Sequence, residues 1–154
     1  MHAHAIHVAA IVEAFSSSFL GVLIENPASV LVHRRTRSDE FSRHLDRSGG
    51  LRRLLEHLLP DRSQGKSFDT VVDHDETASV ACALTALCVA AGDYTAVGNE
   101  DGWIFLPPPA LIQPWAWIIL ANNAREGGLE WRGSSPVPAR NGRPISGATP
   151  NAPS

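Results

Sequence analysis

The sequence predicts a single, helix-dominated α+β domain with a small, mostly antiparallel sheet. Hydrophobic residues make up 44% of the 154 residues and charged residues 19%, a balance that supplies enough apolar surface for one core. Several segments repeat apolar residues at spacings of three and four, as amphipathic helices do. Short β-branched or aromatic runs between glycines are typical of hairpin strands. We expect residues 1–131 to form the domain and the Pro/Gly/Ser-rich residues 132–154 to form a disordered tail.

The N-terminal part of the chain favours helices. Residues 5–24 carry one apolar stripe, but no Lys or Arg precedes them and polar residues, including Glu13, interrupt them. This pattern predicts an amphipathic helix that ends before Pro27, and we expect neither a signal peptide nor a membrane span here. Residues 29–32 fit either a strand or a continuation of the helix.

Two further helices are predicted before residue 60. Ser38 is a good N-cap for a helix over residues 38–47. The following helix, over residues 51–59, places its leucines at spacings of three and four and ends at Pro60. Leu55 lies in the middle of this stripe, so we expect its side chain to be buried.

The second half of the chain mixes strands and helices. Residues 68–72 have the composition of a strand, and the Ala/Leu-rich residues 77–91 have that of a helix. Residues 94–97 and 103–106 predict a hairpin, because a glycine-containing loop joins them. Proline at position 114 predicts the start of a last helix, which extends to about residue 126.

The two cysteines do not form a disulfide pattern. Cys82 and Cys88 lie six positions apart, which turns their side chains about 240° away from each other on a helix. We expect two buried, unpaired thiols, as in proteins of a reducing compartment, and therefore a cytoplasmic protein.

An acidic string carries the strongest suggestion of chemistry. Asp73, His74, Asp75 and Glu76 follow the predicted strand and precede a predicted helix, a common arrangement of active sites in α/β folds. These four residues are the candidate catalytic residues. If the strand continues through them, Asp73 and Asp75 point to the same side and become candidate ligands of a divalent metal cofactor.

The string also resembles a known family motif. An apolar run followed by Asp73-x-Asp75-x-Thr77 is similar to the first motif of the haloacid-dehalogenase-type phosphotransferases. The resemblance implies that Asp73 is the nucleophile and Asp75 the acid/base. Residues 117–123 are similar to the second motif of that family, with Ala121 in place of the Thr or Ser. The family also needs later basic and acidic motifs, which the remaining residues do not supply.

Two other interpretations fit the same residues. The pair His74-x-Glu76 resembles the motif of zinc deaminases, whose Pro-Cys-x-x-Cys partner the two cysteines do not form. Alternatively, the acidic residues have a structural role, since carboxylates at a helix N-terminus cap free amides and complement the helix dipole, each for about 0.3–1 kcal/mol. Because the string matches two unrelated motifs and completes neither, the structural interpretation is the one we adopt.

Charge and its distribution argue against nucleic acid. The net charge is −3 and the isoelectric point is near 6.1. Eight arginines lie between residues 33 and 62, but acidic residues alternate with them, and Glu56 lies four positions after Arg52, the spacing of a surface ion pair.

Taken together, these patterns predict a small soluble binding or regulatory module. We expect it to self-associate through apolar helix faces or to bind a protein partner, without contacting nucleic acid or a membrane. The alternative is a metal-dependent hydrolase or phosphotransferase centred on Asp73, His74, Asp75 and Glu76.

Overall fold

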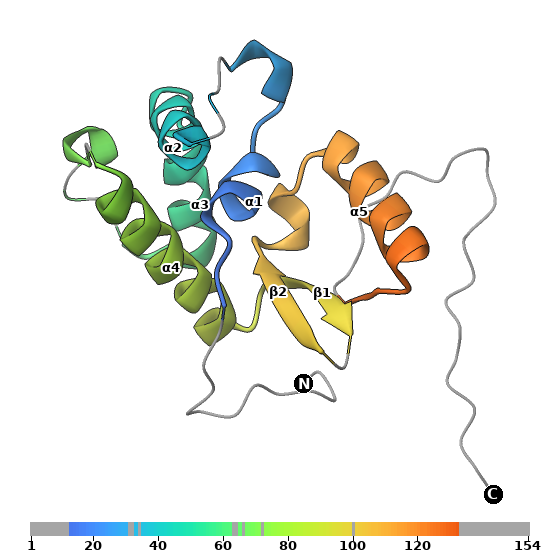
Figure 1. Cartoon of the computed structure of the whole chain (residues 1–154). Coiled ribbons are helices and arrows are strands. Elements are labelled where there is room, and N and C mark those ends of the chain that lie inside the picture. The colour runs from blue at the N-terminus through green and yellow to red at the C-terminus, as the bar shows by residue number, and fades with distance from the viewer. Residues whose placement is uncertain are drawn as a thin grey trace, which may run out of the picture.

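The computed structural model describes residues 13–30, 33, 35–62, 65, 67–71, 73–99 and 101–132. In these residues the chain forms a helix-dominated α+β fold with a small antiparallel sheet, as predicted (Figure 1). The elements in chain order are α1 (Ser16–Gly21), the 3₁₀ turn η1 (Pro27–Ser29), α2 (Arg37–Arg47), α3 (Gly50–Leu58), the 3₁₀ turn η2 (Phe68–Thr70), α4 (His74–Ala91), β1 (Thr95–Asn99), β2 (Gly102–Leu106), the 3₁₀ turn η3 (Pro109–Leu111), α5 (Pro114–Gly127) and β3 (Glu130–Arg132).

The short helix α1 lies at the centre of the helical part of the fold. It packs against α2 and α4, and α3 completes this group through its contacts with α2 and α4 (Figure 1). Phe19 of α1, Leu45 of α2 and Leu54 of α3 are at most 1% exposed and form the middle of the helical core. Gly21 lets α2 approach closely, because a Cβ at this position would lie 3.1 Å from the Phe41 ring.

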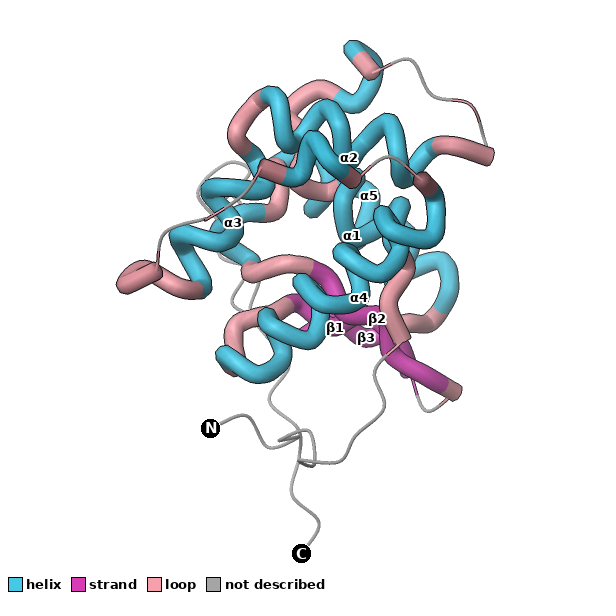
Figure 2. Tube along the Cα trace, turned by 90° about the vertical axis from the view of Figure 1, so that its left-hand side faces the viewer, coloured by secondary structure: helices cyan, strands magenta, loops and turns pink. Residues whose placement is uncertain are grey.

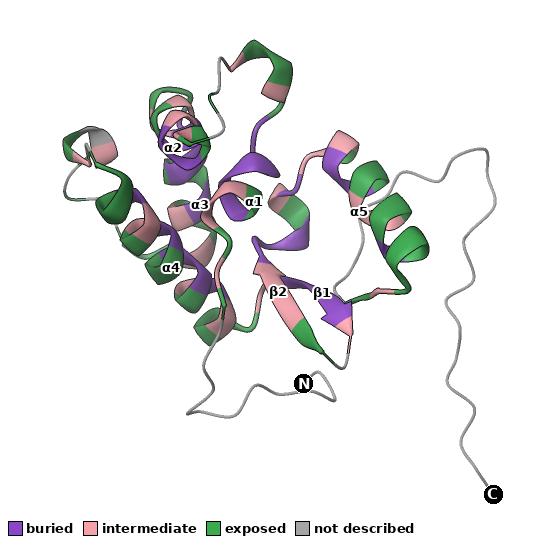
Figure 3. Ribbon diagram, in the orientation of Figure 1, coloured by how far each residue is buried: buried purple, intermediate pink, exposed green. Residues whose placement is uncertain are grey.

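The sheet and α5 enclose a second core. The strand order is β2-β1-β3 and both pairs are antiparallel. Figure 2 shows the three strands gathered on one side of the molecule, with the helices filling the rest. Val97 of β1, Leu106 of β2 and Trp117 of α5 are buried together in this core. Figure 3 shows the contrast between the buried strand β1 and the largely exposed outer side of α5.

The hairpin and several helices confirm the predictions. β1 and β2 are each one residue longer than expected, and Asn99 pairs with Gly102 at the end of the hairpin. Helices α2, α3 and α5 lie within one or two residues of their predicted bounds. α4 instead begins three residues early, at His74, because Asp73 and not a later residue is its N-cap.

The predicted strand over residues 68–72 is wrong. Phe68–Thr70 is a 3₁₀ turn, and the turn is held to α2 because the Asp46 carboxylate accepts a hydrogen bond from the Phe68 amide at 3.4 Å. Val72 lies outside the described residues. The third strand is β3, where Trp131 pairs with Val97 of β1. A strand needs a partner, and β1 finds that partner in Trp131 rather than in residues 68–72.

The first helix is shorter than predicted. Residues 13–15 are not helical and α1 occupies only Ser16–Gly21, while residues 5–12 lie outside the described residues. The helix ends early because Leu23 and Ile24 bond to carbonyls three positions back, at 3.2 and 3.1 Å, which tightens the chain into a turn. Of residues 29–32, only the first two are described, and residue 29 ends η1.

The two cysteines differ in burial. Cys82 is exposed, so only one of the two thiols is buried as predicted, and no disulfide joins them. Burial and the nearby charge of Asp93 raise the pKa of the Cys88 thiol to about 12, so it stays protonated and unreactive.

The predicted tail begins at Arg132, which ends β3; residues 133–154 lie outside the described part of the chain. No helix in that described part is both long and apolar enough to cross a membrane.

Leu55 is only half-buried, which contradicts the expectation that it is a core residue. The stripe of α3 is rotated, so that Leu51 and Leu54 are completely buried instead. We therefore expect Leu54→Ala to lower the free energy of unfolding by about 2–5 kcal/mol. Leu55→Ala, the matched control, should cost clearly less. Urea unfolding of both variants measures this, and equal losses would contradict the burial difference.

Gly98 in the hairpin has no room for a side chain. A Cβ at Gly98 would overlap the carbonyl oxygen of Gly102 and lie 2.8 Å from Cα of Trp103, whereas a Cβ at Gly102 meets open space. We expect Gly98→Ala to lower the free energy of unfolding by roughly 1–3 kcal/mol, because the strands must move apart. Gly102→Ala should leave stability within about 0.5 kcal/mol of the wild type. Chemical denaturation compares the two variants, and a tolerated Gly98→Ala would show that the strand spacing adapts easily.

Candidate functional site

The acidic string lies at the N-terminus of α4, where it forms a helix cap. The Asp73 side chain accepts a hydrogen bond from the Glu76 amide at 2.7 Å, and its backbone carbonyl accepts one from the Thr77 hydroxyl at 3.0 Å. Asp75 and Glu76 are exposed in the first turn, where carboxylates complement the positive end of the helix dipole. The capping role that the sequence offered as the structural interpretation is therefore present.

His74 binds a residue of another helix. Its Nδ1 lies 3.1 Å from Oδ1 of Asp39, a carboxylate near the start of α2. Asp39 is only 7% exposed as a residue. The pair connects α2 to α4, so it contributes to the packing of the helical core. Sequence reasoning missed Asp39 because 35 positions separate it from His74.

Two of the four candidate catalytic residues, Asp73 and His74, contact different parts of the fold. The Asp73 carboxylate turns back onto the helix amides, and the His74 ring contacts α2. Among the described residues, no group of three or more His, Cys, Asp and Glu side chains is placed to hold a metal ion. The two candidate ligands Asp73 and Asp75 therefore have no third protein ligand in that part of the chain.

The layout implied by the phosphotransferase resemblance is also missing from the described residues. A 3₁₀ turn, not a strand, precedes the acidic string, and the sheet is antiparallel. Residues 117–123, which are similar to the second motif, form the middle of α5. Residues 67–71, the described segment before Asp73, thus form no sheet edge from which the motif residues could project.

The arginine-rich segment forms α2 and α3 and is partly neutralised by ion pairs. Arg43 pairs with Glu40 at 2.8 Å, and Arg52 pairs with Glu56 at 4.0 Å, as the spacing predicted. Arg53 differs, because its Nη1 donates to the backbone oxygen of Ser48 at 3.2 Å and no carboxylate of the described residues lies within ion-pair distance.

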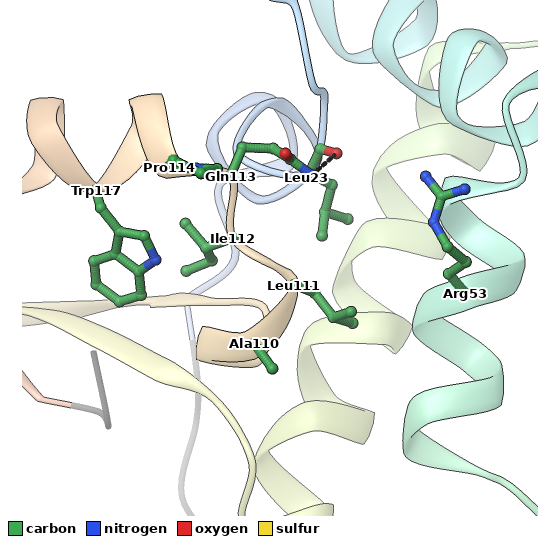
Figure 4. A pocket seen from close by; sticks show the side chains of 8 residues that line it. All are labelled: Leu23, Arg53, Ala110, Leu111, Ile112, Gln113, Pro114 and Trp117. Carbon is green, nitrogen blue, oxygen red and sulfur yellow. Dashed lines mark hydrogen bonds between the residues drawn. The ribbon is translucent and has the colours of Figure 1, made fainter. Parts of the chain in front are cut away.

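A cleft lies between α3 and the start of α5, and Arg53 forms one of its walls (Figure 4). Its volume is about 270 Å³, near the lower end of the roughly 300–1,000 Å³ typical of ligand pockets. Leu23, residues 110–114 and Trp117 complete the lining. The lining side chains are apolar apart from Arg53, Gln113 and the indole nitrogen of Trp117, and none of them is acidic.

Sequence reasoning did not find this cleft. Its walls come from the turn after α1, from α3 and from the segment leading into α5, so no single motif marks it. The signal in the sequence is the grouping of prolines and tryptophans between residues 107 and 117, which does not by itself indicate a cleft.

The outer face of α5 is a second surface of interest. Ile118 is 63% exposed and Ile119 is 48% exposed. Asn122 and Asn123 are exposed one turn farther along the same helix. We call these four residues the α5 outer face. No charged residue occurs between positions 114 and 124, so the face is apolar and amide-bearing.

The comparisons with known proteins supply no relative. No family model matches the sequence, and neither a curated protein nor a solved structure matches it.

The cap and metal roles of Asp73 predict different results. As a cap, Asp73→Ala should lower the free energy of unfolding by about 0.5–2 kcal/mol, while Asp73→Asn should cost less, because Asn is also a good N-cap. We expect magnesium, manganese and zinc to produce no ion-specific rise in the melting temperature. Thermal and urea unfolding of the wild type and both variants test this. An ion-specific rise in the wild type that Asp73→Asn abolishes would support the metal site instead.

Proposed function

We propose that this chain is a binding or regulatory module that acts as a homo-oligomer, and that two copies associate through the α5 outer face. The observation that carries the proposal is the exposure of two adjacent isoleucines, Ile118 and Ile119, on a surface helix. Burying one such side chain contributes roughly 1.5–3 kcal/mol, and a two-fold interface buries both isoleucines of each copy.

The chemistry of the face favours a second copy as the partner. A two-fold axis brings each residue close to its own equivalent, so a face with charges of one sign would repel itself. The four residues of the α5 outer face carry no charge, and the amides of Asn122 and Asn123 can both donate and accept hydrogen bonds. The Arg125 guanidinium lies at the edge of the face, where it donates to Oδ1 of Asn122 at 3.5 Å. Such a surface is complementary to itself.

Two other properties accompany this proposal. The free thiols of Cys82 and Cys88 support a cytoplasmic, reducing environment. The alternative, a metal-dependent hydrolase or phosphotransferase, gains no support from the acidic string, because Asp73 and His74 are engaged in capping and packing.

Sedimentation over a range of protein concentrations tests the association. We expect the wild type to shift from monomer to dimer as concentration rises. Ile118→Asp places two carboxylates face to face in the dimer and should weaken association at least about tenfold, which corresponds to about 1.4 kcal/mol. Leu59→Asp is the matched control, since Leu59 is also exposed but lies at the end of α3, and it should dimerise like the wild type.

Two results would overturn the proposal. One is a wild type that stays monomeric at every concentration up to about 1 mM, the scale at which only about 4 kcal/mol of association free energy is needed. The other is a dimer that Ile118→Asp and Leu59→Asp weaken equally, which would place the interface elsewhere.

A further inference from the structure

The outer edge of β3 has no neighbouring strand among the residues that the structure describes. The order β2-β1-β3 makes β3 an edge strand, which pairs with β1 along one side only. In an antiparallel ladder, successive residues point their N–H and C=O groups to opposite sides, so Glu130–Arg132 turns backbone donors and acceptors outward. Such an edge is a template for pairing with a strand of another chain.

This edge lies on the side of the molecule away from the helical core. The other edge strand, β2, contacts α1 and α4, whereas β3 lies on the far side of β1. Figure 1 shows α5 on this side as well, opposite α3 and α4. Ile118 follows Ala116 by two positions, about 200° around the helix, and Ala116 is buried in the core with Val22. The side of α5 that carries Ile118 therefore faces the same way as the β3 edge.

The charges of β3 are complementary to those of a second copy. When two β3 strands pair antiparallel about Trp131, Glu130 of each copy lies opposite Arg132 of the other, and opposite residues share one face of a sheet. A pairing centred on Glu130 places two acids opposite each other, and one centred on Arg132 places two bases opposite each other. Since like charges in opposite positions repel, the charges select the register about Trp131.

Trp131 is fixed in position before any pairing occurs. Its ring packs edge-to-face on Trp117 with ring centres 5.7 Å apart, yet Trp131 is still 39% exposed. The ring lies on the sheet face that α5 covers, because its strand partner Val97 is buried with Trp117. Positions 130 and 132 belong to the opposite face, since residues alternate along a strand. A pairing about Trp131 thus brings two apolar rings together on one face and opposite charges together on the other.

We propose that two copies pair through the outer edges of β3, antiparallel about Trp131, and so join their three-stranded sheets into one continuous sheet. This inference rests on the proposed function, because it adds a second contact to the same homodimer. A three-residue strand is too small to hold a dimer alone, since stable interfaces bury about 1,200–2,000 Å² in total. The α5 outer faces supply the further apolar area.

Charge exchange at β3 tests the pairing, with sedimentation of the full chain as the measurement. Glu130→Arg places arginines opposite each other and Arg132→Glu places acids opposite each other, so each should weaken dimerisation about tenfold or more. The double variant restores opposite charges and should dimerise within about threefold of the wild type. Glu56→Arg is the matched control, because it makes the same change of charge on α3 and should dimerise like the wild type.

Two further measurements separate pairing from folding. Circular dichroism at concentrations where the chain is monomeric should show the same fold and melting temperature for all four variants and the wild type. Hydrogen exchange should slow in the backbone amides of β3 when the wild type is raised to dimeric concentrations, because these amides become bonded to the second copy.

The outcomes distinguish this inference from the proposed function. The β3 pairing is overturned by a wild type that stays monomeric, by single exchanges that dimerise like Glu56→Arg, or by a double variant that does not recover. A dimer that Ile118→Asp weakens but the β3 exchanges do not overturns the β3 pairing alone. A dimer that the β3 exchanges weaken and Ile118→Asp does not supports the β3 pairing and contradicts the α5 outer face.

Discussion

The fold depends on a three-residue segment, Val22–Ile24, that belongs to both cores. Val22 packs with the sheet and α5, while Leu23 and Ile24 pack among the helices. The carbonyls of this segment are fixed by α5: the Gln113 amide bonds to Val22 at 2.9 Å, and the Trp115 indole bonds to Ile24 at 2.8 Å. A six-residue helix such as α1 is not stable alone, so these bonds and the burial of its side chains hold it in place.

The sequence alone was sufficient to predict the helices and strands whose first and last residues favour the start or the end of such an element. The helix 114–127 follows from proline at its first position and glycine at its end, and the hairpin follows from its glycine-containing turn. Residues 68–72 have strand composition but no strand partner, whereas Glu130–Arg132 has little signal and pairs with β1. Composition shows which secondary structures a segment can adopt, whereas pairing with a distant segment decides whether it forms a strand.

The candidate site, too, could be predicted from the sequence only in part. A capping role for the acidic string was visible in the sequence because a cap and its helix are adjacent, although the sequence did not identify Asp73 as the N-cap residue. The contact of His74 with Asp39 and the cleft wall formed by Arg53 were not visible, since each depends on how α2, α3 and α4 pack. The acidic string is conspicuous through its residue types, whereas the cleft exists only because distant segments pack together.

Helix α5 explains why the cleft and the proposed interface occur together. A surface helix normally carries charge on its outer face, but α5 has none from residue 114 to residue 124. Its inner face is used by Ala116 and Trp117, which are buried against the sheet, and its start forms the cleft with Arg53. Ile118 and Ile119 belong neither to the core behind the sheet nor to the lining of the cleft. An exposed apolar face that the core does not use is a feature of interaction surfaces, which is why we propose that a second copy covers it.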